Sequence, residues 1–289
     1  MKKILVPVDF SENTWSVCQY ALLLAGNEST EIRLFNSFFD QVIVTDSSFP
    51  TGIDTETMIN EQLLMDIRQR SENDIQLLQS RLIDQVRSKG LKNIKVVYTL
   101  EGGEPEFEIL DMENEYKPDL IVMGTHGSGE KGFLEGSVSK KIMDHAKAPV
   151  FAIPELKDNP VIGRVLYLSE ISDADIPVLD KTFSILKHYN PALFFLHLLI
   201  SNERQEAQER LKPIENHFAD KEREGNITYH ILPESNIQDD IEAFIREHDI
   251  SLVAFIPHKK GFFKRLFYQG ITKKNLLQTN MPLLAIRET

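Results

Sequence analysis

Five glycines gather between residues 124 and 136, directly after the apolar run at 120–123. Glycine tolerates positive φ and lets a ligand approach the main chain. Where a strand ends in such a turn and a helix follows, unpaired N–H groups and the helix dipole favour an anion such as phosphate. Gly136 and Ser137 open the helix expected at 136–145, and the serine adds a hydroxyl donor. This pattern predicts a nucleotide site; the alternative is a helix cap with a mobile loop.

Two better-known phosphate motifs do not account for these glycines. Residues 127–132 match G-x-G-x-x-G, but they follow the fourth expected strand, whereas a dinucleotide motif follows the first. A P-loop is absent because Gly132 precedes phenylalanine and Gly136 precedes serine. Phosphate contacts would therefore come from backbone and hydroxyl donors. Lys131 is either a flexible helper or an ordinary solvated side chain.

Asp9 ends the first apolar strand and is the second candidate ligand residue. If strands one and four flank the point where strand order reverses, Asp9 and Gly124 share one sheet edge. The carboxylate could then accept hydrogen bonds from a ribose or an adenine amino group. The alternative is N-capping of a helix beginning near Glu12, which Ser11 could also provide. The run of Gly, Glu and Pro at 103–105 borders the same edge, and its first role is structural because proline suits the first helical position.

Catalytic and metal chemistry find little support in the sequence. His126 lies in the glycine turn, but no nucleophile with a base is spaced around it, so loop positioning or ligand contact is favoured over acid–base work. The eight histidines include no H-E-x-x-H pair, and a single cysteine excludes an internal disulfide or a cysteine-based zinc site. Cys18 falls in an apolar helical pattern, which favours packing over chemistry. The sequence therefore predicts neither catalytic residues nor a metal site.

Alternating strand and helix patterns must position these residues. The first half predicts strands at 3–9, 31–38, 94–100, 120–124 and 150–153, with helices at 12–25, 55–88, 105–115 and 136–145. The strands are apolar without alternation, as burial on both faces requires. This order predicts an α/β fold with a doubly wound parallel sheet.

The second half repeats the same order. It predicts strands at 164–169, 192–199, 227–232, 252–256 and 283–286, with helices at 176–188, 203–224, 237–247 and 270–278. A constant offset of 161 pairs Ile4 with Val165 and Asn36 with His197, and later segments pair at a smaller offset. We therefore expect two tandem domains, 1–154 and 161–289, joined by a polar linker at 155–160 and facing each other about a pseudo-two-fold axis.

Composition limits the partners. With 289 residues, 42% of them apolar, and a net charge of −12, the chain suits a soluble two-domain protein whose acidic surface discourages nucleic-acid binding. The apolar run before Asp9 is too short for a signal peptide or a membrane span, so we expect a cytoplasmic protein. The basic and aromatic stretch at 259–267 is either a membrane anchor or a solvated face over packed aromatics. The second is favoured because the stretch aligns with the loop and helix of the first half.

Three segments together resemble the universal stress protein family: VPVDFSEN at 6–13, EGGEP at 101–105 and MGTHG followed by GS within 123–137. The tandem arrangement is similar to that of its two-domain members. The resemblance implies two Rossmann-like, adenine nucleotide alpha hydrolase-like domains, each with a five-stranded parallel sheet flanked by helices. It also implies ATP binding, because a subset of the family uses a G-x-x-G, nine residues, G-[ST] motif. The implied ligand residues are Pro7, Val8, Asp9 and Ser37 around the adenosine, Met123, Gly124, His126 and Gly127 on the floor, and Gly136, Ser137 and Val138 at the phosphates.

The chain departs from the family pattern in two places. Only eight residues separate Gly127 from Gly136, one fewer than the motif has. The second half carries Ile256, Pro257, Lys259 and Gln269 where the first half has Gly124, Thr125, Gly127 and Gly136. Proline lacks an N–H and side chains fill the approach, so we expect no ATP in the second half.

The leading hypothesis is a stress-response regulator that binds ATP, ADP or AMP, with or without Mg²⁺, in its first domain and hydrolyses ATP weakly at most. The rival hypothesis is a scaffold that binds no nucleotide and works through an unidentified protein partner. In either case we expect no nucleic-acid or membrane partner. The chain would act as an internal pseudo-dimer or as a homodimer.

Overall fold

The structure is a computed structural model that describes the backbone of residues 1–38, 53–125, 138–155, 161–199, 204–233, 237–257 and 281–288. Side chains are described over the same ranges except 53–61 and 237–238. The first half contains β1 (Lys2–Pro7), α1 (Thr14–Ala25), β2 (Thr30–Phe38), α2 (Ile53–Ser88), β3 (Ile94–Gly102), α3 (Pro105–Tyr116), β4 (Leu120–Gly124), α4 (Val138–His145) and β5 (Val150–Ile153). The second contains β6 (Arg164–Leu168), α5 (Asp175–Leu186), β7 (Ala192–Leu199), α6 (Arg204–His217), α7 (Ala219–Arg223), β8 (Ile227–Pro233), α8 (Ile237–Glu247), β9 (Leu252–Phe255) and β10 (Leu283–Ala285).

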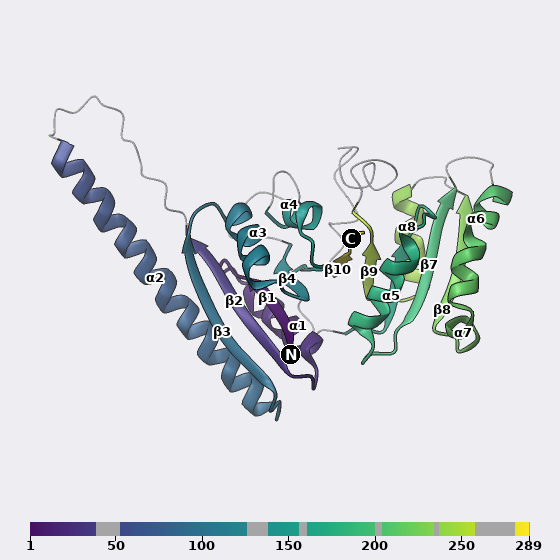
Figure 1. Ribbon diagram of the computed structural model, residues 1–289, viewed down its shortest axis with the longest axis horizontal. Helices are drawn as coiled ribbons and strands as arrows, with labels where there is room; N and C mark the ends of the chain where they lie inside the picture. Colours follow the sequence, from purple (N-terminus) through teal and green to yellow (C-terminus); the bar gives the residue numbers. More distant parts are fainter. Residues whose placement is uncertain are drawn as a thin grey trace.

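The described strands form one continuous sheet in the order β3-β2-β1-β4-β5-β10-β9-β6-β7-β8. Within each half, neighbouring strands are parallel, which confirms the predicted five-stranded parallel sheets. Only β5 and β10 pair antiparallel, with Phe151 opposite Leu284 at the centre of the junction. The halves therefore stand side by side about an approximate two-fold axis (Figure 1). The sequence predicted this pseudo-symmetry, but it did not predict that the two sheets join into one.

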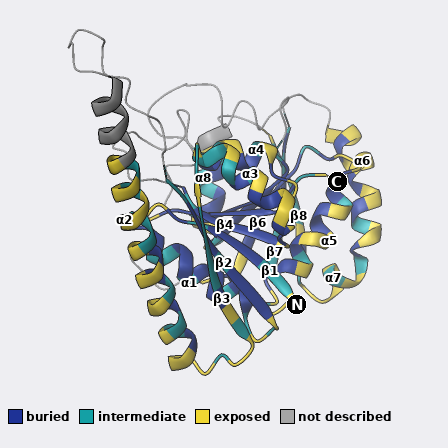
Figure 2. Ribbon diagram, turned by 60° about the vertical axis from the view of Figure 1, so that its left-hand side comes forward, coloured by how far each residue is buried: buried dark blue, intermediate teal, exposed yellow. Residues whose placement is uncertain are grey.

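Helices cover both faces of the sheet, and β1 shows why its sequence lacks alternation. Ile4 and Val6 point into a core shared with α1, α2, α5 and α6. Leu5 points to the opposite core, which is shared with α3, α4 and α8. All three side chains are fully buried, and Figure 2 shows the buried sheet between the helical layers. Two-sided burial therefore explains the uninterrupted apolar runs.

Three expected element boundaries were wrong. The first strand ends at Pro7, so Asp9 lies in the following turn. Helix α1 begins at Thr14, two residues later than expected, because Phe10 adopts a left-handed backbone with φ 58. The helix expected at 203–224 is two helices, since Phe218 leaves helical geometry at φ −102 and ψ 18.

The two halves match each other in fine detail. Phe10 and Ile171 occupy the same position at the offset of 161, and both are left-handed, with φ 58 and φ 53. The side-chain Nδ2 of Asn36 donates to the carbonyl of Val8 at 2.8 Å. In the second half, Nδ1 of His197 lies 2.9 Å from the carbonyl of Ser169. These pairs confirm the alignment that the sequence indicated.

An ionic contact on Glu28 ties the halves together. Lys187 lies 2.5 Å and His188 3.1 Å from its carboxylate. The hydrogen bonds from Lys187 and His188 lower the pKa of Glu28 to about 2. Because the pKa is depressed in the folded protein, the stabilisation is present above the unfolded pKa, near 4.5, and is lost as the pH falls toward 2.

Glu28→Gln should therefore lower the free energy of unfolding near pH 7 by less than about 1 kcal/mol, because the pair is partly exposed. The difference from the parent protein should shrink as the pH falls from 4.5 toward 2. Urea unfolding across this range measures it. Glu115→Gln, an exposed substitution on α3, serves as the control and should show no such convergence. A Glu28→Gln difference that stays constant across the range would contradict the prediction.

Candidate functional site

Strand order reverses between β1 and β4. These strands pair directly, with Ile4 opposite Leu120 and Leu5 opposite Ile121. From this pair the sheet continues through β2 on one side and through β5 on the other. In open α/β sheets, ligands bind at the carboxyl ends of the strands at such a reversal. The residues that follow β1 and β4 therefore lie on one edge, as the sequence predicted for Asp9 and Gly124.

Asp9 orders the turn between β1 and α1. Its Oδ1 accepts hydrogen bonds from the Ser11 backbone N–H at 3.1 Å and from the Thr14 hydroxyl at 3.3 Å. The alternative N-capping role was wrong, because α1 begins at Thr14 with Asn13 at its N-cap position and no side-chain cap hydrogen bond. Asp9 is also exposed at the sheet edge, so the same carboxylate holds the turn and borders the candidate site.

Besides Asp9, the residues expected around the adenosine are Pro7, Val8 and Ser37, which lie at the end of β1 and in β2. The Val8 N–H donates to the Phe35 carbonyl at 2.8 Å, and the Val8 carbonyl accepts from Asn36. Both backbone groups of Val8 are therefore committed to neighbouring β2, which leaves its largely buried side chain. Pro7 and Ser37 are half-buried beside it.

The carboxyl end of β4 meets the start of α4. Met123 is buried, Gly124 is half-buried, and the N–H of Thr125 donates to the Ile153 carbonyl at 2.9 Å. The hydroxyl of buried Ser139 donates to the Thr125 carbonyl at 3.3 Å. This bond holds the first turn of α4, which starts at Val138, against the end of β4. A helix N-terminus consequently lies at the predicted edge.

The glycine turn between these two points belongs to residues 126–137, which lie outside the described part of the chain. Four expected site residues fall there: His126, Gly127, Gly136 and Ser137. Lys131 falls there too, and Lys259 and Gln269 of the second half lie in a further segment outside the description.

Two buried amide side chains at this edge were missed by sequence reasoning. Asn36 is 6% and Asn13 is 4% exposed, and the Nδ2 of Asn13 donates to the Ile153 carbonyl at 2.8 Å. The Oδ1 atom of each has no hydrogen-bond partner among the described residues. Such an acceptor is costly unless a donor reaches it. The sequence signal was available, because polar Asn36 follows the apolar pair Leu34 and Phe35 near the end of an expected strand and aligns with His197.

Gly103 keeps the loop after β3 close to α3. Its φ is 144, and a Cβ there would clash with the side chain of Glu108. Pro105 is the first residue of α3. The predicted structural role of this loop agrees with both observations, since only glycine accommodates that backbone and that contact.

In the second half, the turn after β6 is held by hydrogen bonds to a buried carboxylate. Asp175, which aligns with Thr14, is 1% exposed and accepts hydrogen bonds from the Tyr167 hydroxyl at 2.7 Å and the Ser169 hydroxyl at 2.8 Å. Its Oδ2 also accepts from the Ser172 N–H at 2.6 Å. Burial and the Asp175 carboxylate raise the pKa of Tyr167 well above its usual value. The polar groups of this turn are therefore buried and hydrogen-bonded to one another.

Arg210 of α6 covers the same turn. Its guanidinium donates to the Glu170 carbonyl at 3.0 Å and also to the Ile171 carbonyl. Glu170 is the residue that aligns with Asp9. The Arg210 side chain thus uses two backbone acceptors of the turn in the second half. After β9, the position that aligns with Gly124 is held by Ile256, which is buried.

The sequence profile of the universal stress protein family matches residues 1–154, more than half of the chain. The chain belongs to the universal stress protein family. A universal stress protein of Synechocystis sp. is 28% identical over 155 residues, which are 52% of this chain and 96% of that protein. Another, from Methanocaldococcus jannaschii, is 26% identical over 160 residues, 54% of this chain and 84% of that protein. Both matches confirm the resemblance noted in the sequence.

The tandem architecture also occurs in a solved universal stress protein. The crystal structure of one from Archaeoglobus fulgidus covers 99% of this chain and 96% of its own, with a TM-score of 0.68 and 18% identity. At that identity the likeness concerns the fold alone. It supports a universal stress protein fold that includes the second half.

The structure also bears on the expectations for Cys18, for metal sites and for membrane spans. Cys18 is fully buried, and burial raises the pKa of its thiol to about 12, which suits packing. Across the described ranges, no three His, Cys, Asp or Glu side chains come together as a metal site requires. Within the same ranges, no helix is both long and apolar enough to cross a membrane.

Proposed function

We propose that this universal stress protein binds an adenine nucleotide at the carboxyl edge of β1 and β4 in its first half and acts as a regulator. The observation that carries the proposal is the direct pairing of β1 with β4 at the point where strand order reverses. That pairing brings together the exposed carboxylate of Asp9, the half-buried Gly124 and the N-terminus of α4.

The chemistry of this edge suits a nucleoside phosphate. The unpaired Oδ1 of Asn36 would accept a hydrogen bond from an amino or hydroxyl donor. Val8 and Met123 offer apolar surface to a base, and the N-terminus of α4 favours a phosphate. ATP, ADP and AMP share these groups. Mg²⁺, where present, would compensate phosphate charge.

The second half is proposed to bind no nucleotide. Its equivalent turn is closed by Asp175, and Arg210 occupies the neighbouring carbonyls. Pro257, at the position of Thr125, cannot donate a backbone hydrogen bond. One nucleotide per chain is therefore expected.

Isothermal titration of nucleotide-free protein with ATP, with and without Mg²⁺, tests the proposal. Asp9→Ala should weaken binding by about tenfold or more, because a charge-assisted hydrogen bond is lost. Glu170→Ala, the aligned change in the second half, should leave binding unchanged. Asp9→Asn keeps an acceptor for Ser11 and Thr14 and so separates turn stability from ligand contact. No heat up to about 1 mM ATP would end the proposal.

The rival function, a scaffold for a protein partner, is favoured by α2. This helix runs past the end of the sheet (Figure 1), and three of its apolar side chains are exposed. Met65 is 65%, Leu77 is 72% and Leu63 is 40% exposed. Contiguous exposed apolar patches mark protein contacts, so the scaffold function requires these side chains to form one patch. If ATP gives no heat, a pull-down lost in Leu63→Glu/Met65→Glu but retained in Asp9→Ala would support the scaffold.

A further inference from the structure

A groove between the two halves lies away from the proposed nucleotide edge. Its volume is about 550 Å³. One wall is formed by residues near the end of α3, before β4 and before β5, and the other by α5 and the segment after β10. Asp119, in the first wall, precedes β4, whereas the nucleotide edge lies beyond Gly124 at the other end of that strand. The groove is therefore a separate site, and its size falls within the range of small-molecule pockets, about 300–1,000 Å³.

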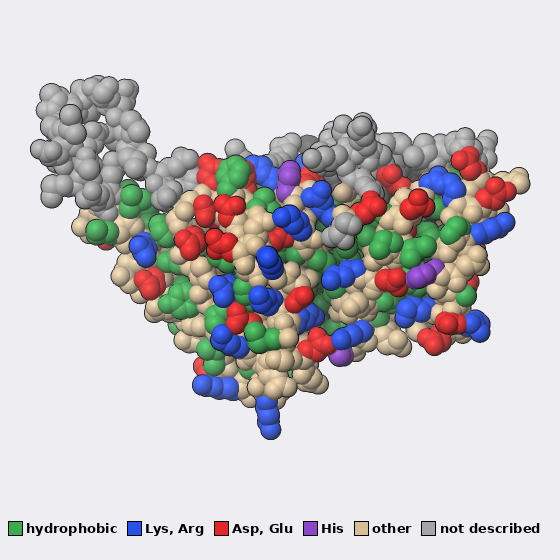
Figure 3. Space-filling model, viewed as in Figure 1, with side chains coloured by type: hydrophobic (Ala, Val, Ile, Leu, Met, Phe, Trp, Pro, Cys, Tyr) green, Lys and Arg blue, Asp and Glu red, His purple; other side chains and the backbone are tan. Residues whose placement is uncertain are grey.

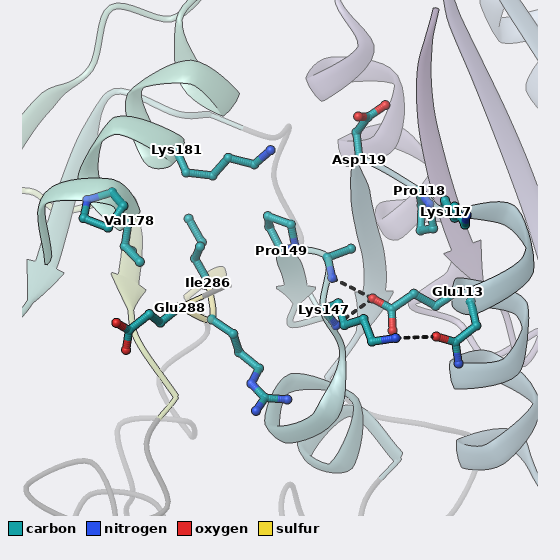
Figure 4. A pocket seen from close by; sticks show the side chains of 14 residues that line it. Glu113, Lys117, Pro118, Asp119, Lys147, Pro149, Val178, Lys181, Ile286 and Glu288 are labelled. Atoms are coloured by element: carbon teal, nitrogen blue, oxygen red, sulfur yellow. Dashed lines mark hydrogen bonds between the residues drawn. The ribbon is translucent and has the colours of Figure 1, made fainter. Parts of the chain in front are cut away.

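Four cations from both halves line this groove: Lys117, Lys147, Lys181 and Arg287. In Figure 4, Lys181 extends from the α5 wall toward the wall that carries Asp119 and Pro118. Lys and Arg side chains also gather along the middle of the surface in Figure 3, where the halves meet. The grouping stands out in a chain whose net charge is −12.

Among the described residues, no ion pair neutralises these four charges. The ion pairs formed by the described residues lie elsewhere, and none of them includes a groove cation. Where groove cations have hydrogen-bond partners, these are uncharged: Nζ of Lys147 donates to Oδ1 of Asn114 at 2.7 Å, and Arg287 donates to the His145 carbonyl at 3.0 Å. Positive charge therefore stays available inside the groove.

The groove also holds three carboxylates, two of which are committed to the backbone. Oε1 of Glu113 accepts from the N–H groups of Lys147 and Ala148 at 2.7 and 2.6 Å (Figure 4). Asp119 accepts from the Lys3 N–H at 2.7 Å. The third, Glu288, lies on the opposite wall. Four cations against three carboxylates leave a formal charge of +1.

The pseudo-symmetry of the fold provides an internal comparison. At the aligned positions of the other half, Lys117, Lys147, Lys181 and Arg287 correspond to Asp249, Asn280, Tyr20 and Pro154. No aligned residue is a cation. Duplication alone therefore does not account for the basic groove; the four charges are particular to this side of the junction.

Apart from Asn114, the remaining lining is apolar. Val178 of α5 and Ile286 after β10 face Pro149 across the groove (Figure 4). An apolar surface in a groove with a formal charge of +1 suits a ligand that has an anionic group and a small hydrophobic body. We propose that this groove is a second ligand site, which binds a small organic phosphate through Lys181, Arg287 and Lys147. The ligand would contact both halves at once.

Titration of the full chain with phenyl phosphate and with inorganic phosphate at low ionic strength tests the site. Low salt preserves attraction between exposed charges. Phenyl phosphate should bind about tenfold more tightly than inorganic phosphate, because its ring covers apolar surface. Lys181→Gln/Arg287→Gln should weaken phenyl phosphate binding by about tenfold or more. Equal affinity for the two probes would overturn the assignment of an organic ligand.

Two controls locate the binding. Lys89→Gln/Lys212→Gln removes the same charge from exposed positions outside the groove and should change the affinity by less than about twofold. Asp9→Ala should leave phenyl phosphate binding intact, so failure of the nucleotide proposal and failure of this one remain distinguishable. Absence of heat up to about 10 mM probe, or full affinity in the Lys181→Gln/Arg287→Gln protein, overturns the proposal.

Discussion

Replacing Asp175 with alanine should cost about 3–5 kcal/mol of the free energy of unfolding. This carboxylate is 1% exposed and accepts hydrogen bonds from the hydroxyls of Tyr167, Ser169 and Ser172 and from the backbone N–H of Ser172. Alanine would remove the acceptor of these four donors inside the second half. Because domains of this kind are stable by only about 5–15 kcal/mol, the loss should be visible as a large shift in the urea midpoint.

The first half supplies a matched control for this change. Thr14 occupies the aligned position, and its hydroxyl makes a single hydrogen bond to Asp9 at 3.3 Å. Thr14→Ala should therefore cost only about 1 kcal/mol. Asp175→Asn, which keeps an acceptor and the side-chain volume, should fall between the two. Equal losses for Asp175→Ala and Thr14→Ala would show that the hydrogen-bond network does not carry the stability of the turn.

The second large effect is expected at the junction of the halves. Phe151 is fully buried at the centre of the β5–β10 pairing, opposite Leu284, and its ring centroid lies 5.9 Å from that of Tyr20. Phe151→Ala should cost about 3–5 kcal/mol, since it removes a large buried ring and leaves a cavity. The cavity would open where the two sheets join. Thermal and urea unfolding measure the loss.

Phe107 provides the comparison, because it is a phenylalanine of the same half with 58% of its surface exposed. Phe107→Ala should change the free energy of unfolding by no more than about 0.5 kcal/mol. Phe151→Leu, which fills much of the volume, should recover more than half of the loss caused by alanine. A Phe151→Ala protein as stable as Phe107→Ala would contradict a tightly packed junction.

Much of this architecture was predictable, because it depends on local patterns. The apolar runs at Ile4 and Leu120 indicated strands buried on both faces, and the offset pairing Asn36 with His197 indicated a duplicated domain. Helix boundaries were less predictable. The start of α1 depends on the left-handed conformation of Phe10, a residue type that gives no signal for it. Phe218 lies where one expected helix breaks in two, and its residue type does not predict that break either.

In the candidate site, too, some residues were predictable from the sequence and others were not. Asp9 and Gly124 could be proposed from the sequence, since residue type and strand order place both on one edge. The unpaired acceptors of Asn13 and Asn36 could not be, because they depend on which neighbours reach each side chain. The closure of the second turn by Asp175 and Arg210 likewise depends on groups far apart in the chain.

The order of residues along the chain thus determined the family and the repeated α/β pattern, and it led to the proposal of a nucleotide edge, because hydrophobic periodicity and glycine placement act over short distances. Only the tertiary structure decided that the two sheets join through Phe151 and Leu284. It alone also brought Lys147 and Lys181 to the walls of one groove. The physical reason is that packing between the two halves sets the antiparallel pairing of β5 and β10. The same packing places the groove cations side by side, and no local sequence pattern encodes it.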